Sequence, residues 1–243
     1  MTGRRERYLQ ALGIPVFVLR DRPGAEAAED GQGEGAPPET TRPAAPSPAA
    51  ASPALEIAVP TEWPALAEAV KACTRCALHR GRKQAVFGVG RPDAELMVVG
   101  EAPGADEDRQ GEPFVGPAGR LLNAMLRSIG YPRADVYIAN ILKCRPPNNR
   151  DPRPEEAVAC TPFLERQIEL VSPKALLAVG RIAAQWLLQT DAPIGRLRGR
   201  VFRYREIPLV VTYHPAYLLR TPQAKATAWQ DLCMVKQLLV ERS

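Results

Sequence analysis

From about residue 63 onward, short apolar runs alternate with longer segments in which apolar residues recur with a helical period. The short runs have the length and aliphatic composition of strands that are buried on both faces, and the longer segments are typical of amphipathic helices. Strands are expected at residues 96–99, 136–139, 175–179 and 209–211, and helices at 64–72, 119–129, 154–170, 181–188 and 224–240. This alternation predicts an α/β fold, a three-layer α/β/α sandwich around a central, mainly parallel four-stranded sheet, with residues 201–204 as a hairpin partner of the fourth strand.

The N-terminal part of the chain does not follow this pattern. Residues 22–62 are rich in proline and alanine and hold few apolar side chains for a core, which predicts a disordered linker. Residues 1–21 combine a short basic helix pattern with the strand-like run 14–20. They are either a frayed terminus or a peptide that docks on a protein partner or on the domain itself. The folded domain is expected to span residues 63–243.

Composition and charge narrow the class of protein. The apolar runs are shorter than the roughly 18 residues of a membrane span, and the N-terminus lacks a secretory signal. Five cysteines in 243 residues do not suggest a secreted disulfide framework, so a cytoplasmic monomer without a membrane partner is expected. The net charge of +5 is uneven, because residues 61–243 carry 26 bases and 19 acids. That basic excess suits a polyanionic partner such as DNA, although many cytosolic domains share it.

Four of the five cysteines are candidate metal ligands. They are Cys73 and Cys76, which form a Cys-x-x-Cys pair, and Cys144 and Cys160. Such a pair begins both zinc and iron–sulfur sites, but separations of 68 and 16 residues to the later cysteines fit no compact zinc finger. The sequence thus predicts a metal centre and leaves its type open, with His79 as an alternative ligand. Cys233 lies in an apolar helical pattern and is expected to be a buried thiol.

Polar side chains follow three of the four predicted strands. Glu101 follows the first strand in the loop of residues 100–104, Asn140 follows the second, and His214 follows the fourth. Ligand sites of open parallel sheets form beyond the carboxyl ends of the strands, so these side chains are expected to reach one rim. Each also has a structural interpretation, as an exposed acid, a turn-capping asparagine and a surface histidine. Phe114, in a loop rich in glycine and proline, is either a core residue or a stacking platform.

Four motifs lie in this region of the chain. They are Gly100-Glu-Ala-Pro-Gly104, Pro113-Phe-Val-Gly116, Asn140-Ile-Leu-Lys-Cys-Arg-Pro-Pro-Asn-Asn-Arg150 and His214-Pro-Ala-Tyr-Leu-Leu-Arg220. Together with the four cysteines, they resemble the motifs of family 4 uracil-DNA glycosylases, the iron–sulfur members of the uracil-DNA glycosylase superfamily. The resemblance covers about residues 65–243. It implies a DNA repair enzyme that hydrolyses the N-glycosidic bond of uracil in DNA, is monofunctional and leaves an abasic site.

The resemblance also implies a role for individual residues. A 4Fe-4S cluster would be held by Cys73, Cys76, Cys144 and Cys160. Phe114 would stack on a flipped-out uracil, Asn140 would read its Watson–Crick edge, and His214 would lie beside uracil O2. The uracil-binding residues would be Gly100, Glu101, Ala102, Gly104, Phe114, Asn140 and His214. The expected DNA contacts are Lys143, Arg145, Arg150, Tyr217, Leu218, Leu219 and Arg220, with the run from Tyr217 entering the duplex.

The chemistry of the reaction points to catalytic candidates independently. Cleavage yields an anionic base and a cationic sugar, so a site needs donors at the base and a carboxylate or an oriented water near the sugar. His214 can donate, and Glu101, with Asn149 as its partner, can stabilise the cation or orient the water. Glu107 is hypothesised to block the 5-methyl group of thymine. Uracil in single- or double-stranded DNA is the expected substrate, with U·G favoured over U·A because flipping is easiest at a weakened pair.

Other interpretations stay open on the sequence. The chain could be a non-catalytic, metal-containing module that binds nucleic acid, or a glycosylase for other deaminated bases, and zinc is an alternative metal. The segment 106–113 is short and lacks histidine. A related branch of the superfamily that traps uracil sites covalently carries a basic, histidine-containing insertion there, so ordinary turnover is expected instead.

Overall fold

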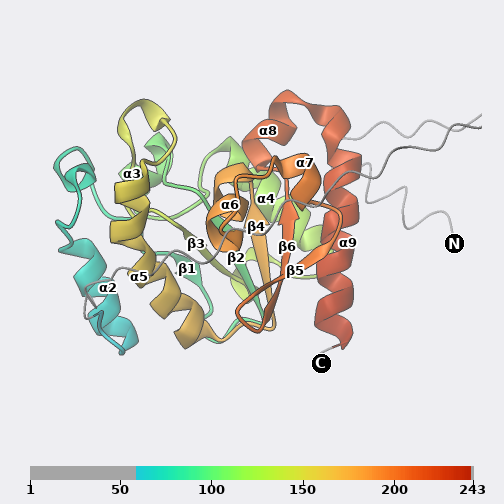
Figure 1. The fold of residues 1–243 in the computed structure, drawn as a ribbon, viewed down its shortest axis with the longest axis horizontal. Helices are drawn as coiled ribbons and strands as arrows, with labels where there is room; N and C mark the ends of the chain where they lie inside the picture. Colours follow the sequence, from blue (N-terminus) through green and yellow to red (C-terminus); the bar gives the residue numbers. More distant parts are fainter. Residues whose placement is uncertain (1–58, 242–243) are drawn as a thin grey trace, which may run out of the picture. The chain divides into compact units, whose positions relative to one another are not determined.

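A six-stranded sheet in the order β1-β3-β2-β4-β6-β5 forms the centre of residues 59–241, the part of the chain that this computed structural model describes (Figure 1). The strands are β1 (Val89–Gly90), β2 (Leu96–Gly100), β3 (Tyr137–Asn140), β4 (Ala175–Val179), β5 (Val201–Tyr204) and β6 (Ile207–Thr212). The four central strands are parallel. The short edge strands β1 and β5 pair antiparallel with β3 and β6.

Helices cover both faces of this sheet. The described helices are α2 (Trp63–Lys71), α3 (Ala105–Gln110), α4 (Pro117–Ser128), α5 (Pro154–Val171), α6 (Arg181–Leu188), α7 (Ile194–Leu197), α8 (Pro215–Arg220) and α9 (Lys225–Glu241). Short 3-10 turns lie at Ala77–Arg80, Arg133–Asp135, Pro147–Asn149 and Pro222–Ala224.

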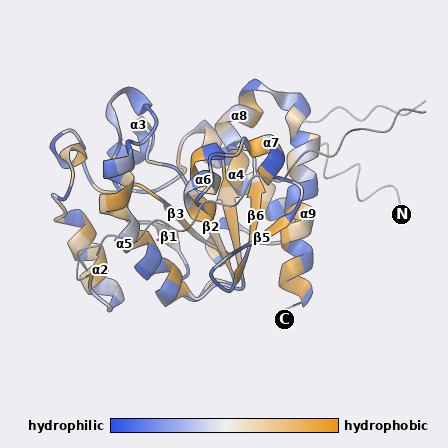
Figure 2. Ribbon diagram, viewed as in Figure 1, coloured by the Kyte–Doolittle hydropathy of each residue, from blue (hydrophilic) through white to orange (hydrophobic). Residues whose placement is uncertain are grey.

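Successive residues of each central strand belong to different cores. Met97 and Val99 of β2 pack with α2, α5 and α6, whereas Leu96 and Val98 pack with α4, α8 and α9. Both faces are therefore apolar, which is why the strands read as unbroken aliphatic runs. In Figure 2 the central strands are mostly orange, while α9 alternates between orange and blue along its length. The expected three-layer α/β/α sandwich is confirmed.

The expected elements are all present, with bounds shifted by no more than two residues. The sheet has six strands rather than four because two antiparallel strands extend its edges. One of these, β5, is the expected hairpin partner of β6. The other, β1, is only two residues long, which is too short for an alternation of apolar and polar residues to be recognised in the sequence. Residues 1–21 and all but the last few residues of the predicted linker 22–62 lie outside the described residues.

Backbone hydrogen bonds join the carboxyl ends of neighbouring central strands. These hydrogen bonds position the residues that follow each strand. The amides of Ile141 and Leu142 donate to the carbonyl oxygens of Gly100 and Glu101, both at 3.0 Å, so pairing continues past the ends of β2 and β3. On the other side, the amide of Gly180 donates to the Thr212 carbonyl at 2.9 Å. The loops at this edge therefore start from fixed points. None of the helices within residues 59–241 has the length and apolarity that crossing a bilayer requires.

Candidate active site

A cavity of about 480 Å³ opens at the carboxyl ends of β2, β3 and β6. Eleven of the residues that the sequence singles out line it, namely Glu101, Ala102, Gly104, Glu107, Phe114, Asn140, Asn149, Arg150, His214, Tyr217 and Arg220. They come from four separate segments of the chain. The volume lies within the usual range of roughly 300–1,000 Å³ for pockets that enclose small ligands. The expectation that the strand ends share one rim is confirmed.

Asn140 supplies an unused hydrogen-bond acceptor to this cavity. The residue is 2% exposed at the end of β3, and its Oδ1 atom has no hydrogen-bond partner among the described residues. Buried polar atoms are rarely left without a partner, because the lost hydration is not regained. Its neighbour Gly100 cannot carry a side chain, since a Cβ there would lie 2.3 Å from Asn140 Oδ1 and 2.7 Å from the Phe114 ring. Gly100 thus lets the carboxamide and the aromatic ring meet in one wall.

His214 is held neutral and in one tautomer. Its Nδ1 atom accepts a hydrogen bond from the Ala216 amide at 3.1 Å, at the start of α8. Burial and, to a smaller extent, the charge of Arg220 lower the pKa of His214 from 6.5 to about 4, against the opposing effect of Glu107. A neutral ring whose Nδ1 accepts must carry its proton on Nε2. His214 is therefore a neutral hydrogen-bond donor near pH 7.

Glu101 is poised to exchange a proton near neutral pH. Burial and, to a smaller extent, the charge of Asp151 raise the pKa of its carboxyl group from 4.5 to about 7, against the opposing effect of Arg181. Arg181 at the start of α6 donates from Nη2 to Asp151 Oδ2 at 2.6 Å. Asp151 itself lines the cavity and is a residue that the sequence analysis missed. Its position directly after Arg150 in the third motif is the signal that could have found it.

The Phe114 loop and the loop after β2 are joined by a single carboxylate. Glu107 in α3 accepts from the amides of Gly104 at 3.1 Å and Val115 at 3.0 Å. Phe114 has a left-handed backbone with φ of 55° and is 6% exposed, and its ring centre lies 5.6 Å from that of His214. Arg133 braces the same loop from behind by donating from Nη2 to the Pro113 carbonyl at 2.7 Å. Phe114 is thus both nearly buried and part of the cavity wall, and Arg133 is a support that sequence reasoning missed.

The four candidate metal ligands come from three segments that pack against one core. Cys144 and Cys160 are buried, and Cys73 and Cys76 pack half-buried against the same core. Arg82 Nη1 donates to Cys144 Sγ at 2.9 Å, and the Lys143 amide donates to Cys160 Sγ at 3.2 Å. Burial raises the pKa of the Cys144 and Cys160 thiols, to about 12 for Cys160, and nearby cysteines add to both shifts.

No three metal-binding side chains within residues 59–241 converge on a single-ion position. A single zinc ion would need thiolates all within about 2.3 Å of one point. Each thiolate of a four-iron cluster binds a different iron, so such a cluster accepts a wider spacing. His79 Nδ1 lies 2.7 Å from the Cys76 carbonyl oxygen. Cys233, half-buried on α9, is outside the set.

Comparison with known proteins decides the family. The profile of the uracil DNA glycosylase superfamily matches residues 87–233, which is more than half of the chain. The chain belongs to the uracil-DNA glycosylase superfamily.

Individual relatives within this superfamily cover most of the domain. A type-4 uracil-DNA glycosylase of Archaeoglobus fulgidus is 44% identical over 177 residues, which are 70% of this chain and 89% of the relative. A type-4 uracil-DNA glycosylase of Pyrobaculum aerophilum is 44% identical over 177 residues, 70% of this chain and 90% of the relative. A third, from Thermotoga maritima, is 46% identical over 157 residues, 64% of this chain and 82% of the relative. The profile match at residues 87–233 thus includes the sheet, the residues that line the cavity and two of the four candidate ligands, Cys144 and Cys160.

Two of the predicted DNA contacts, Lys143 and Leu218, are wrong because both side chains are buried. Lys143 is 1% exposed, and its Nζ atom donates to the Asn140 carbonyl at 2.8 Å and to Gln167 Oε1 at 2.5 Å. Its buried ammonium group is therefore not available to a phosphate. It holds the backbone of Asn140 in place through the hydrogen bond to the Asn140 carbonyl oxygen. Leu218 is 1% exposed and packs into the core with α4 and α9, so it cannot enter a duplex.

The other predicted contacts lie around the cavity mouth. Tyr217 and Leu219 are 38% and 45% exposed on the outer side of α8, and Arg220 lines the cavity. Arg145 Nε donates to Asn149 Oδ1 at 2.8 Å, so the arginine holds the proposed partner of Glu101. Arg145 and Arg150 also line a neighbouring cavity of about 520 Å³ beside the cysteine segment. The exposed residues and the arginines thus lie around the two cavities, and the burial of Leu218 follows from its position on the inner face of a helix.

Proposed function

We propose that the protein excises uracil from DNA by hydrolysing the N-glycosidic bond, and that it leaves an abasic site. The observation that carries this proposal is the buried, unpartnered Oδ1 of Asn140 in a cavity shared with Phe114 and a neutral His214. An enzyme that acts on a base within DNA must take the base out of the stack and enclose it. The relatives named as type-4 uracil-DNA glycosylases support the same reaction.

Base recognition follows from the donors and acceptors of Asn140. Its Oδ1 can accept from uracil N3–H while its amide group donates to O4. Cytosine presents the reverse pattern at these positions, so it would leave two buried groups unpaired. The Phe114 ring offers the apolar face on which the flipped base can stack.

Catalysis follows from the charges that develop when the bond breaks. The departing uracil gains negative charge at O2, where the Nε2–H of neutral His214 and the amides of residues 100–104 can donate. A neutral imidazole suits this step, because its Nε2–H can donate to the developing anion and still keep its proton. Above a pH of about 7, Glu101 is ionised, and it can then stabilise the cationic sugar or orient water with Asn149.

A uracil-release assay tests the proposal. The full chain should release free uracil from a single-stranded oligonucleotide and from U·G and U·A duplexes. Asn140→Ala and His214→Ala should lose most of this activity, and Gln223→Ala, an exposed change outside the cavity, should keep it. DNA binding without any base release would favour the non-catalytic module instead. Release of hypoxanthine or xanthine in place of uracil would favour a different lesion specificity.

Glu107 is the proposed gate against thymine. It lines the cavity, and its carboxylate joins the loops of Gly104 and Val115. Glu107→Ala should loosen both loops and leave room beside C5, so the ratio of thymine to uracil release should rise while uracil release falls. Glu107→Gln keeps the size and an acceptor oxygen and serves as the matched control. If Glu107→Ala gains no activity on thymine, Glu107 is a loop brace and not a gate.

We further infer that the four cysteines hold a 4Fe-4S cluster. The donor set fits, because four thiols from three segments pack against one core and two of them already accept N–H hydrogen bonds, which also stabilise thiolates in iron–sulfur sites. When bound, the cluster would tie the cysteine segments together, and none of the cleavage chemistry above needs an electron from it. Anaerobically purified protein should be brown and contain iron and sulfide. A colourless protein that contains zinc would contradict the inference.

The remaining expectations stay predictions. They are that the enzyme is a cytoplasmic monomer, and that residues 1–21 dock on a protein partner or on the domain. Light scattering of the full chain tests the first in part, since a monomer should have the mass of 26.5 kDa. Comparing the DNA repair partners retained by the full chain and by a chain with a scrambled 1–21 segment tests the second.

A further inference from the structure

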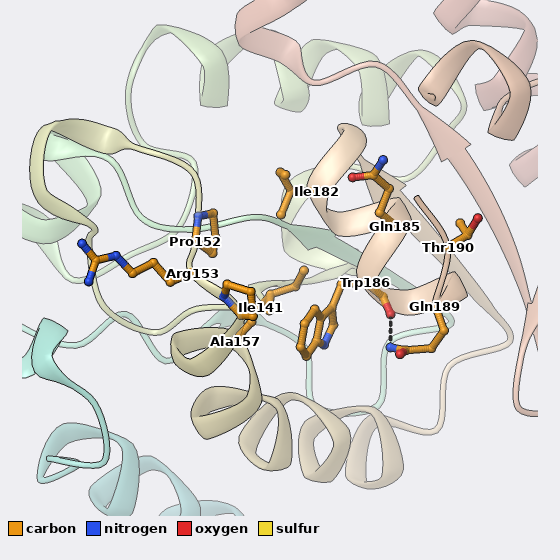
Figure 3. Close-up of a pocket in the computed structure, with 10 residues that line it drawn as sticks. Ile141, Pro152, Arg153, Ala157, Ile182, Gln185, Trp186, Gln189 and Thr190 are labelled. Atoms are coloured by element: carbon orange, nitrogen blue, oxygen red, sulfur yellow. Dashed lines mark hydrogen bonds between the residues drawn. The ribbon is translucent and has the colours of Figure 1, made fainter. Parts of the chain in front are cut away.

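A second cavity, of about 290 Å³, lies between α5 and α6 next to the proposed active site (Figure 3). Ile141, Ala157 and the half-buried Trp186 form its apolar lining. Gln189 and Arg153 lie at its rim, and none of the residues that line it is acidic. The volume is at the lower end of the usual range of roughly 300–1,000 Å³ for ligand pockets. The cavity is therefore large enough for one planar ring system.

This cavity adjoins the uracil cavity through consecutive residues. Asn140 lines the uracil cavity and Ile141 lines the second one. In the same way, Asp151 lines the first cavity and Pro152 lines the second. The two cavities therefore adjoin each other along these two segments of the chain.

Side-chain hydrogen bonds fix the ridge between the two cavities, which consists of Asp151, Arg181 and Gln185. Arg181 donates to Asp151 at 2.6 Å and to Gln185 Oε1 at 3.2 Å, and so it joins a residue of each cavity. Gln185 is anchored in turn by donating to the carbonyls of Asp191 and Ala192 at 2.9 and 3.0 Å. The ridge thus sets a constant spacing between the two cavities, which a ligand that spans both would need.

We propose that the second cavity binds an unpaired base of the same DNA strand, at one fixed position near the flipped uracil. This rests on the proposed excision of uracil from DNA, and adds a recognition subsite to it. The aromatic face of Trp186 in an apolar cavity suits a nucleobase, because every base has a π-face that can stack on such a ring. Arg153 at the rim, with Arg145 in the neighbouring cavity, suits the phosphates on either side of that base.

The consequence is a measurable preference for unpaired DNA beside the uracil. A base that is paired in a duplex cannot enter the cavity, whereas a base in a single strand can. Stacking on an aromatic side chain contributes about 1–3 kcal/mol per base, so loss of the subsite should weaken binding by at least about fivefold. The subsite contributes to affinity and not to bond cleavage, so KM should change more than kcat.

A scan along single-stranded oligonucleotides tests the proposal. Each oligonucleotide carries one uracil and one propanediol spacer, which keeps the phosphates but removes the base at a single flanking position. For the full-length wild-type chain, KM should rise at least about fivefold when the spacer occupies one particular position. Trp186→Ala should show the raised KM with every oligonucleotide and no further loss at that position. Trp186→Phe should keep most of the position dependence, since it retains a ring.

Controls separate the possible results. Val158→Ala, which trims an apolar side chain that is 61% exposed on α5, should behave as wild type. If uracil is released but no spacer position changes KM, the subsite is wrong while the proposed function stands. If no uracil is released from any oligonucleotide, the proposed function itself fails. Equal effects of Trp186→Ala on single-stranded and fully duplex substrate would also overturn the subsite.

Fluorescence gives a readout that does not depend on activity. The chain has three tryptophans, so Trp63→Phe with Trp229→Phe leaves Trp186 as the only emitter. Single-stranded DNA should quench this emission, and a propanediol spacer at the position found above should abolish the quenching. If Trp186 is already shielded from acrylamide in the free full-length chain and DNA changes nothing, a segment of the protein covers the cavity, and the base subsite is contradicted.

Discussion

At the scale of single residues, the site contains polar groups that the protein leaves without a hydrogen-bond partner or holds where burial opposes their charge. Asn140 keeps a buried acceptor without a partner, and Glu101 keeps a carboxyl group where burial opposes its charge. Both arrangements cost folding free energy, because buried polar atoms and buried charges lose hydration. Such costs are expected at sites whose missing partner is a ligand.

Asn140→Leu should separate function from stability. Leucine has nearly the shape of asparagine but no polar atoms, so two hydrogen bonds to uracil are lost. At about 1.5 kcal/mol each, this should lower kcat/KM for uracil release by about 100-fold. The free energy of unfolding should stay the same or rise, since a buried unpartnered acceptor is removed. A large loss of stability in urea denaturation would show instead that the carboxamide has a structural partner.

The pH dependence should report Glu101. Its pKa of about 7 means that the carboxyl group is protonated below that pH and ionised above it, so kcat/KM should rise with pH through about 7. His214, with a pKa of about 4, stays neutral throughout this range, so its titration does not change the pH profile of kcat/KM there. Glu101→Gln should lower the rate and flatten the profile.

The neighbours of Glu101 supply a matched pair of controls. Removing the negative charge with Asp151→Asn should lower the apparent pKa, and removing the positive charge with Arg181→Gln should raise it. Shifts in the same direction for both variants would mean that another group sets the profile.

At the scale of elements, the end of β6 is held by a buried ionic network. Asp231 of α9 is fully buried and accepts from Arg198 at 2.8 Å and from Thr212 Oγ1 at 2.9 Å. Thr212 is the last residue of β6, and His214 follows two residues later. The network therefore fixes the end of β6, two residues before the proposed catalytic residue His214.

Asp231→Ala should be strongly destabilising. It leaves the guanidinium of Arg198, whose side chain is 13% exposed, without its carboxylate partner. Breaking a buried pair in this way costs about 3–5 kcal/mol, which denaturant unfolding can measure. Asp93→Ala, which breaks an ion pair between two exposed side chains, is the matched control and should leave the stability almost unchanged. Similar stability of the two variants would contradict the structural role of Asp231.

At the scale of the whole molecule, the four candidate ligand cysteines come from distant parts of the chain, and one of them, Cys144, lies beside the rim that is proposed to bind DNA. Cys144 follows Asn140 by four residues and precedes Asn149 by five, so whatever holds it also holds the segment between them. Arg145 and Arg150, two proposed DNA contacts, lie in that segment.

Cys144→Ser should therefore weaken both folding and DNA binding. Loss of one ligand should lower the unfolding transition, because metal binding by residues from distant segments is coupled to folding. Affinity for a uracil-free oligonucleotide, measured by fluorescence anisotropy, should fall as the arginine segment loosens. Cys233→Ser changes a thiol outside the set and should affect neither. DNA affinity that is unchanged in Cys144→Ser would sink the idea that the metal centre supports the DNA-binding rim.

The sequence by itself determined the layered α/β fold, because strands buried on both faces and amphipathic helices have distinct patterns of apolar residues. It also determined which residues reach the rim, such as Glu101, Asn140 and His214, because parallel strands end at the same edge of a sheet. What it could not decide is the direction in which a side chain points once helices and loops pack. Lys143 points inward to the Asn140 carbonyl and Leu218 points into the core, and neither orientation can be predicted from the neighbouring residues in the sequence. The neutral state of His214, the raised pKa of Glu101 and the cavity at Trp186 likewise depend on burial by residues far away in the chain, and burial is a property of the tertiary structure alone.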